Sequence, residues 1–497
     1  MRLRHADLWR QESTIDRLPY FATGVFLVAV KQVLDWLTAT QLFHRPWNVF
    51  NYIVLPPQTV GVLTLPQQDW LFYGTLLVTA LPFIVIGVLL TVQRLRAVGL
   101  PIALVLFFFM PLVNIVMLLL LSVLPTRREP PHEFPDDRDN PDPVPLPANN
   151  PYRNADFDYR HSASWRRLRD AHRRITLNTT VGSGALALGV VVPTTLALVV
   201  LSTMVLENYG WGLFVGLPFC AGMASVVLFG LVRPQSFGAC MMVCFLATTL
   251  VGAGMIVFAL EGAICLLMAA PIGYFLAFLG GVVGFAIQLR PWSLEHNPLV
   301  LLVLAVTLPS LMAAESASSE EPDLFQVCSV VEIDAPPDRV WRQVVSFPEL
   351  PEPDDWVFRT GVAYPVRAEI HGQGAGAERR CVFSTGAFVE PIDVWDEPHR
   401  LAFRVAEQPE PMREWSPYTI HPPHLHGYMV SRRGEFRLTA LDGGRTRLEG
   451  ATWYTNRMWP AFYWRLWSDA IIHRIHLRVL NHIKELAEAR PEAADGK

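Results

Sequence analysis

The segment Arg457–Glu488, "RMWPAFYWRLWSDAIIHRIHLRVLNHIKELAE", has the pattern of a long helix near the end of the chain. Its apolar residues recur at spacings of three and four, which predicts a helix with one buried face that begins close to Pro460. Aromatic residues at its start, such as Tyr463, Trp464 and Trp467, exceed what one buried face needs. Such rings are common at cavity mouths and at bilayer interfaces, so we expect either of these roles or plain packing.

The residues before this helix alternate between apolar and polar, which is typical of β-strands. The first strand is expected at "FQVCSVVEI", Phe325–Ile333, and "APPDRVWRQVV" after it predicts a helix entered through prolines. The sequence "DGG" at Asp442–Gly444 predicts a tight hairpin turn. The remaining strands are expected at 366–371, 378–384, 388–395, 401–406, 428–441 and 445–454.

Four segments of this region resemble the START-like superfamily, which includes polyketide cyclases and dehydrases and lipid-transfer domains. They are "VVEIDAPPDRVWRQVVSFPELP", "GQGAGAERRCVFSTG", "FVEPIDVWDEPHRLAFRV" and "GEFRLTALDGGRTRLEGATWY", and the resemblance covers about Phe325–Glu488. It implies a curved sheet that grips the closing helix, with an apolar cavity between them. The superfamily uses one cavity for both binding and catalysis, so the fold does not decide between these functions.

The expected cavity takes its lining from one stripe of the closing helix and from the segments that face it. The candidates are Trp395, His424, His426, Trp453, Tyr454, Phe462, Leu466, Ala470, His473 and Leu477. Catalytic residues are not identified, although Glu390, Asp393 and Glu414 are possible general acids. We expect no cofactor and no metal, because the histidine spacing matches no zinc motif. The alternative metal set is His424, His426, His473 and His476.

The chain as a whole is too apolar for a soluble protein. Of its 497 residues, 51% are hydrophobic, and the mean hydropathy is +0.28. Several runs have the length that spans a bilayer, roughly 17 to 25 residues. The predicted fold class is therefore a multi-span α-helical membrane protein with a C-terminal α+β helix-grip (START-like) domain. The predicted parts are an N-terminal membrane region (1–125), a disordered Pro/Arg-rich cytoplasmic linker (126–175), a five-span membrane region (176–315) and the START-like domain (322–490).

The N-terminal region resembles a family of small bacterial inner-membrane proteins of unknown function. The family's "RRLHD-G" loop corresponds to Arg94–Gly99, which lacks the histidine and the acidic residue. Its first apolar helix carries Lys31 and Asp35, an intramembrane charge pair that is either functional or self-neutralising. Leu100–Leu124 is long enough for a span. Three spans from a cytoplasmic N-terminus would place the basic linker outside the cytoplasm, against its charge. A re-entrant segment at Pro111–Asn114 or an interfacial first helix would remove this conflict.

The positions of basic residues predict the topology. Arg160–Arg174 is strongly basic and is expected in the cytoplasm, and the later loops alternate between Glu207, Arg233, Glu261 and Arg290. Five spans from the linker place the C-terminal domain outside the cytoplasm. The expected location is the bacterial inner membrane, with several passes.

Composition and charge limit the possible partners. The net charge is -4, and no basic stripe stands out, so we expect no nucleic acid as a partner. The expected partners are the lipid bilayer and a lipid or other hydrophobic small molecule, whereas the oligomeric state is not indicated. The leading hypothesis is membrane-anchored ligand binding, with possible ligand transfer or sensing. The alternatives are a cyclase/dehydrase-type enzyme that uses the same cavity, and a transporter or assembly factor with a regulatory soluble domain.

Overall fold

The computed structural model describes most of the chain in two compact units. The described residues are 14–45, 47, 67–109, 113–126, 180–231, 234–289, 293–317, 322–418, 420 and 422–489. One unit comprises Met1–Gly254 and Pro271–Ser318, and the other comprises Met255–Ala270 and Ser319–Lys497. Apart from Thr126, the predicted linker and its basic end lie outside the described residues.

The first unit is helical. Its helices are α1 (Arg17–Leu37), α2 (Gln67–Val98), α3 (Val113–Val123), α6 (Thr180–Val200), α7 (Leu217–Phe229), most of α8 (Phe237–Val257), the larger part of α9 (Ala263–Gln288) and α10 (Ser293–Ser316). Short π-helical segments extend α1 (Thr38–Leu42) and α6 (Leu201–Val205) and precede α7 (Gly212–Gly216). Within the described ranges, seven of these helices are long and apolar enough to cross a membrane. Five of the seven lie between residues 180 and 316.

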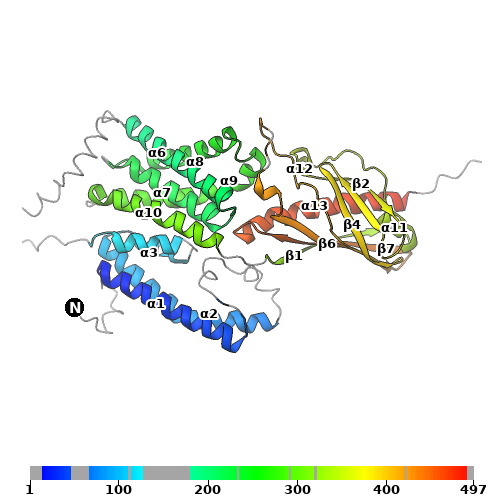
Figure 1. Cartoon of the computed structure of the whole chain (residues 1–497), viewed down its shortest axis with the longest axis horizontal. Helices are drawn as coiled ribbons and strands as arrows, with labels where there is room; N and C mark the ends of the chain where they lie inside the picture. The colour runs from blue at the N-terminus through cyan, green and yellow to red at the C-terminus, as the bar shows by residue number, and fades with distance from the viewer. Residues whose placement is uncertain are drawn as a thin grey trace, which may run out of the picture. The chain divides into compact units, whose positions relative to one another are not determined.

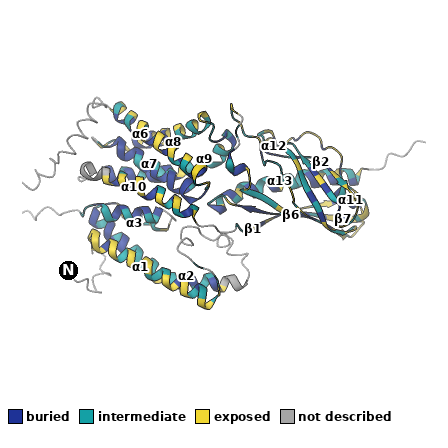
Figure 2. Ribbon diagram, viewed as in Figure 1, coloured by how far each residue is buried: buried dark blue, intermediate teal, exposed yellow. Residues whose placement is uncertain are grey.

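Exposed apolar side chains cover much of this unit. Figure 2 shows exposed residues along α1, α2 and α8. Val28, Leu77 and Leu302 are 57%, 60% and 59% exposed, respectively. The segment Gly212–Phe229, which contains α7, differs because 78% of it is buried. Its glycine-mediated contact with α9 is close: a Cβ at Gly222 would clash with the Ala277 carbonyl. Small residues of this kind allow helix backbones to approach one another.

The N-terminal region differs from its predicted pattern at two places. The segment Arg94–Gly99, which corresponds to the family's loop, is helical as far as Val98, because α2 continues to that residue. The run Leu100–Leu124 is not a single helix, since Ile102–Phe109 is a 3-10 helix and α3 begins at Val113. The predicted re-entrant segment Pro111–Asn114 begins at residues that lie outside the described ranges, because 110–112 are not described.

The two charged residues of α1 contact each other. The Lys31 ammonium forms an ion pair with the Asp35 carboxylate one turn further along the helix, and the Asp35 side chain is 1% exposed. Mutual neutralisation lowers the cost of placing two charges in apolar surroundings. The self-neutralising interpretation of the pair requires this contact.

The second unit contains a seven-stranded antiparallel sheet in the order β1-β7-β6-β5-β4-β3-β2 across the described residues (Figure 1). The strands are β1 (Leu324–Ile333), β2 (Pro365–His371), β3 (Glu378–Phe383), β4 (Gly386–Asp396), β5 (Arg400–Arg404), β6 (Met429–Leu441) and β7 (Arg445–Asn456). The helices are α11 (Pro337–Val345), α12 (Trp356–Arg359), the 3-10 helix Pro423–Leu425 and the closing helix α13 (Ala461–Glu488). Residues 255–270 also belong to this unit, although the sequence places them with the membrane helices.

Local sequence explains how these elements form. The predicted hairpin is confirmed, because Asp442–Gly444 connects β6 to β7, and Gly443 and Gly444 have φ values of 78° and 76°. Glycine adopts this left-handed conformation without steric cost. Helix α13 lies along the sheet (Figure 1), and its Leu480 and Ile483 join the core formed with Trp341 of α11. Each fully buried side chain of this size contributes about 1.5–3 kcal/mol to folding.

Candidate functional site

A cavity of about 130 Å³ lies between the sheet and α13. Strands β3 to β7 supply one wall, and the loop at residues 408–411 supplies part of the rim. Helix α13 supplies the other wall, with Ile471, Ile472, Ile475, His476, Val479 and Leu480. Aromatic residues on the sheet side, among them Phe383, Phe388, Phe403 and Phe436, make the wall largely apolar.

A buried ion pair interrupts this apolar wall. Arg379 of β3 and Glu390 of β4 lie directly opposite each other in the sheet register, and the guanidinium donates to the carboxylate. Their side chains are 2% and 8% exposed, respectively. The Arg379 Nε has no hydrogen-bond partner within the described residues. The cavity therefore presents this buried pair, with a spare donor, in addition to the charged side chains of Glu410, Arg433 and Glu435 in its lining.

Aromatic rings surround the guanidinium. The Arg379 Cζ lies 5.7, 5.4 and 5.6 Å from the ring centroids of Phe347, Phe403 and Phe436, respectively. Arginine at such distances is attracted to the negative faces of the rings. Burial raises the pKa of the Glu390 carboxyl, and the neighbouring Arg379 guanidinium opposes this shift. The environment thus holds a carboxyl group whose affinity for a proton is higher than in water.

His476 adds a neutral polar group to the helix wall. Its Nε2 lies 2.7 Å from Thr452 Oγ1, and its Nδ1 lies 3.1 Å from Ser329 Oγ. Ser329 Oγ also lies 2.6 Å from His473 Nδ1. Burial, together with the nearby His473, lowers the pKa of His476 to about 4. The imidazole is therefore uncharged at neutral pH, and both of its nitrogens are held by hydroxyl groups.

None of the ten predicted cavity residues belongs to the cavity lining. Phe462 and Leu466 are 45% and 68% exposed. Tyr454 is buried, and its hydroxyl bonds to Ser468 Oγ at 2.8 Å. Trp395 packs against Trp341, and Trp453 lies beneath the Arg433 guanidinium. The other five residues also lie outside the lining: Ala470, His473, Leu477, His424 and His426. The lining comes instead from the neighbouring stripe of α13.

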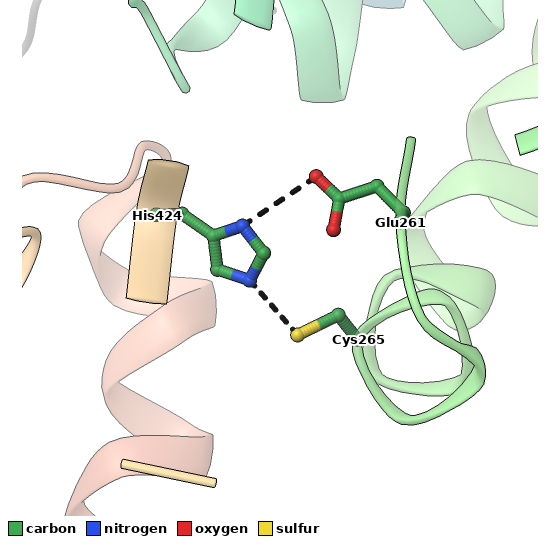
Figure 3. Close-up of side chains that lie close together, drawn as sticks. All are labelled: Glu261, Cys265 and His424. Atoms are coloured by element: carbon green, nitrogen blue, oxygen red, sulfur yellow. Dashed lines mark hydrogen bonds and ion pairs between the residues drawn. The ribbon is translucent and has the colours of Figure 1, made fainter. Parts of the chain in front are cut away.

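The four histidines of the alternative metal set do not meet. His473 and His476 share Ser329, whereas the Nε2 of exposed His426 lies 3.2 Å from Glu410 Oε1. His424 lies between Glu261 and Cys265 (Figure 3). That last trio is the group in the described chain whose donor atoms lie close enough together, within 4.8 Å, to be considered for a metal ion.

Strand alternation is a signal that points to the ion pair. Arg379 is in phase with Cys381 and Phe383, and Glu390 is in phase with Phe388 and Ile392. Residues two apart on a strand point to the same face. A charged residue that shares a face with apolar neighbours on each of two adjacent strands therefore indicates a buried pair.

The curled antiparallel sheet, the closing helix and the cavity between them define a helix-grip, START-like domain. Residues 325–458 match the family described as "Polyketide cyclase / dehydrase and lipid transport". The C-terminal domain, rather than the whole chain, is of this family. The match does not extend to residues 1–125, whose resemblance to small inner-membrane proteins stays a prediction. A search of the curated proteins finds no match to this chain.

Several solved structures are similar to this domain. The Zhui aromatase/cyclase from Streptomyces sp. R1128 has 20% identity and a TM-score of 0.24, and the match covers 35% of this chain and 100% of that chain. Truncated norcoclaurine synthase from Thalictrum flavum has 12% identity and a TM-score of 0.24, covering 35% and 99% of the two chains. A protein from Nitrosospira multiformis has 16% identity and a TM-score of 0.21, covering 32% and 94%. At these scores the similarities support no conclusion about activity or ligand.

Proposed function

We propose that the C-terminal domain binds a small hydrophobic molecule that carries a hydrogen-bonding group. The observation that carries this proposal is the largely apolar cavity with the buried Arg379–Glu390 ion pair in its wall. Apolar walls with a few placed polar groups are typical of small-molecule sites. The spare Arg379 Nε–H is a donor for a carbonyl or hydroxyl oxygen, and Glu390 is an acceptor for a hydroxyl group.

The size of the cavity limits the ligand. Its volume is about 130 Å³, whereas pockets for drug-sized ligands hold roughly 300–1,000 Å³. A cavity of about 150 Å³ in another protein binds benzene. We therefore infer a guest the size of one substituted aromatic ring, or the end of an acyl chain whose remainder stays outside. A whole lipid requires movement of α13 or of the loop at residues 408–411.

Gly450 offers a way to fill the cavity. A Cβ placed there would lie 3.4 Å from Leu480 and 3.7 Å from Phe436, which is ordinary contact. Gly450→Ala should therefore fold normally, whereas the larger side chain of Gly450→Leu should occupy the cavity. The experiment measures thermal unfolding of full-length protein in lipid nanodiscs with p-cresol or toluene.

We expect p-cresol to raise the melting temperature of the wild type and of Gly450→Ala by roughly 5–10 °C at 100 times its Kd. Toluene should have a smaller effect, because it cannot bond to the ion pair. Gly450→Leu should respond to neither compound. An equal response of all three proteins would place the binding elsewhere and contradict the proposal.

The membrane assignment is a second part of the proposal. We infer that the seven apolar helices cross a bacterial inner membrane and anchor the domain on its extracytoplasmic side. Residues 255–270 form one compact unit with residues 319–497, and the rest of α9 and all of α10 lie between these segments in the chain. Two crossings return the chain to the same side, which agrees with the alternation of Glu261 and Arg290 in the loops.

Contacts at the start of α13 support a position close to the bilayer surface. The Tyr463 hydroxyl donates to the carbonyl of Met268 in α9, and Phe462 and Leu466 beside it are exposed. Aromatic and apolar side chains of this kind partition into the interface. A reporter fused after Lys497 that is active only outside the cytoplasm tests the orientation. Activity of a cytoplasm-specific reporter at the same position would contradict it.

An enzyme of the cyclase/dehydrase type is the second candidate function, and Glu390 is the observation in its favour. A buried carboxyl with a raised pKa is suited to general acid or base chemistry. Glu390→Gln retains the shape but cannot transfer a proton. If the domain is an enzyme, this variant should lose turnover while p-cresol still binds. If turnover of a candidate substrate persists, Glu390 is not the acid or base.

A further inference from the structure

A second group of ionisable side chains lies outside the cavity, around His424 (Figure 3). His424 is in the 3-10 helix Pro423–Leu425, Cys265 is in the first turn of α9, and Glu261 lies two residues before that helix. The Cys265 Sγ lies 3.0 Å from His424 Nε2. The His424 Nδ1 lies 3.4 Å from Glu261 Oε1. His424 is about 160 positions from Glu261 and Cys265 in the sequence, yet all three belong to one compact unit.

The two partners of His424 use different ring nitrogens, and this distinguishes the possible roles of the group. A metal held by both Cys265 and Glu261 would bind only one nitrogen of the ring. Ligand sulfur and nitrogen atoms on one tetrahedral zinc are roughly 3.6 Å apart, whereas Sγ and Nε2 lie at hydrogen-bond distance, 3.0 Å. A thiol, an imidazole and a carboxylate in series instead match the order nucleophile, base and orienting group.

The surroundings of the thiol are apolar. Ile264, Met412 and Leu425 form a buried cluster against which Cys265 and Met268 pack. Cys265 is itself half-buried, and it lies in the first turn of a 26-residue apolar helix. Leu267 on the same helix is 70% exposed. A substrate that reaches this sulfur therefore meets hydrocarbon on several sides, as an acyl chain requires.

Two backbone amides converge on an anionic group beside the sulfur. The Ile264 and Cys265 N–H groups donate to the Glu414 carboxylate, at 3.1 and 3.2 Å. Paired amide donors at the start of a helix are also the means by which enzymes stabilise an oxyanion. Movement of the Glu414 side chain would release these donors to an acyl oxygen.

We propose that Cys265 is a nucleophile that accepts an acyl group from a thioester with a long apolar chain. His424 Nε2 takes the proton from the Cys265 thiol, and the sulfur forms a bond to the acyl carbon. The original thioester C–S bond then breaks, and the departing thiolate receives the proton from His424. Glu261 is a positioning residue that holds the imidazole through Nδ1. The products are S-acyl-Cys265 and a free thiol, so no oxidant, reductant or further reactant is needed.

The test follows S-acylation of full-length protein in detergent by a C16 acyl thioester of coenzyme A, with peptide mass spectrometry as the readout. Cys328 is an internal control, because it is an exposed free cysteine on β1. We expect Cys265 to be acylated at least tenfold faster than Cys328. A C2 thioester should react at least tenfold more slowly than the C16 compound at Cys265.

The variants identify the role of each residue. His424→Ala should slow acylation of Cys265 by about 100-fold or more, as expected for loss of a general base. Glu261→Gln should slow it by about tenfold. His426→Ala is the matched control, because its exposed side chain lies two residues away and contacts Glu410. Its rate should equal the wild-type rate.

Near-UV circular dichroism establishes that each variant is folded, and His424→Gln replaces His424→Ala if the alanine variant is not. Acylation of Cys265 no faster than that of Cys328, or a wild-type rate in a folded His424 variant, would overturn the proposal. So would one equivalent of zinc in the purified wild type that is lost in both His424→Gln and Cys265→Ser. These outcomes are independent of p-cresol binding, and the cavity proposal therefore stands or fails separately.

Discussion

The cavity and the cluster around Cys265 both place ionisable groups in apolar surroundings, but they satisfy these groups in different ways. In the cavity, Arg379 and Glu390 neutralise each other across two adjacent strands. In the cluster, His424 connects a thiol to a carboxylate through its two ring nitrogens. The first arrangement balances two opposite charges, whereas the second connects groups between which a proton can move. A closed charge pair is suited to holding structure in place, whereas an open series of thiol, imidazole and carboxylate is suited to proton transfer.

The largest expected effect comes from breaking the closed pair. Arg379→Met leaves the Glu390 carboxylate buried without its partner, which typically costs 3–5 kcal/mol. The double variant Arg379→Met/Glu390→Leu removes both charges and should lie within about 1 kcal/mol of the wild type. Denaturant unfolding of the full-length protein, followed by near-UV circular dichroism, measures the difference.

A neighbouring arginine is the control for this experiment. Arg380 makes a surface ion pair with Glu378, and its side chain is 52% exposed. Arg380→Met should change stability far less than Arg379→Met does, because exposed ion pairs contribute little to folding. Equal costs for the two arginine variants would show that the buried pair has no special structural role.

The next largest expected effect is a loss of folding stability at low pH that is caused by His476. Its pKa is about 4 in the folded protein, and about 6.5 is ordinary for an unfolded chain. Between these values the unfolded state binds a proton that the folded state does not. Stability is therefore fully present above about pH 6.5 and declines as the pH falls toward 4. The loss should be roughly 1–3 kcal/mol, because the side chain is only partly screened from water.

Comparison of variants isolates this contribution from that of other titrating groups. His476→Gln should show a shallower decline between pH 6.5 and 4 than the wild type. His399→Gln should match the wild type, because the His399 side chain is 67% exposed. If His476→Gln and the wild type decline in parallel, the imidazole does not carry the predicted dependence.

The smallest expected effect concerns the cluster around Cys265. Cys265→Ala removes one half-buried thiol from the cluster and should cost less than about 1 kcal/mol of stability. Cys328→Ala, at an exposed position, should have a similarly small effect. A loss of 3 kcal/mol or more at Cys265, as measured by the same unfolding experiment, would mean that the cluster is structural.

The sequence predicts the elements of the domain better than it predicts the residues of the cavity. The alternating strands, the hairpin at Asp442–Gly444 and the closing helix all occur, because each depends on local spacing. Helix α13, however, carries two apolar stripes. One contains Leu466, Ala470 and Leu477, and the other contains Ile472 and Val479. Periodicity alone does not determine which stripe faces the sheet, and the cavity uses the second.

The cluster could not be predicted for a different reason. His424 and Cys265 lie far apart in the sequence, and no motif connects them. Their proximity depends on residues 255–270 joining the C-terminal unit. The aromatic start of α13 is explained in part by the same packing, since Trp464 is buried and Tyr463 bonds to the Met268 carbonyl.

Helix α9 belongs to both compact units, and the division falls between Ala270 and Pro271. Pro271 lies inside this helix and supplies no N–H to the preceding turn. A helix bends most easily where such a bond is missing. We therefore expect any bend in α9 to lie in the turn that precedes Pro271.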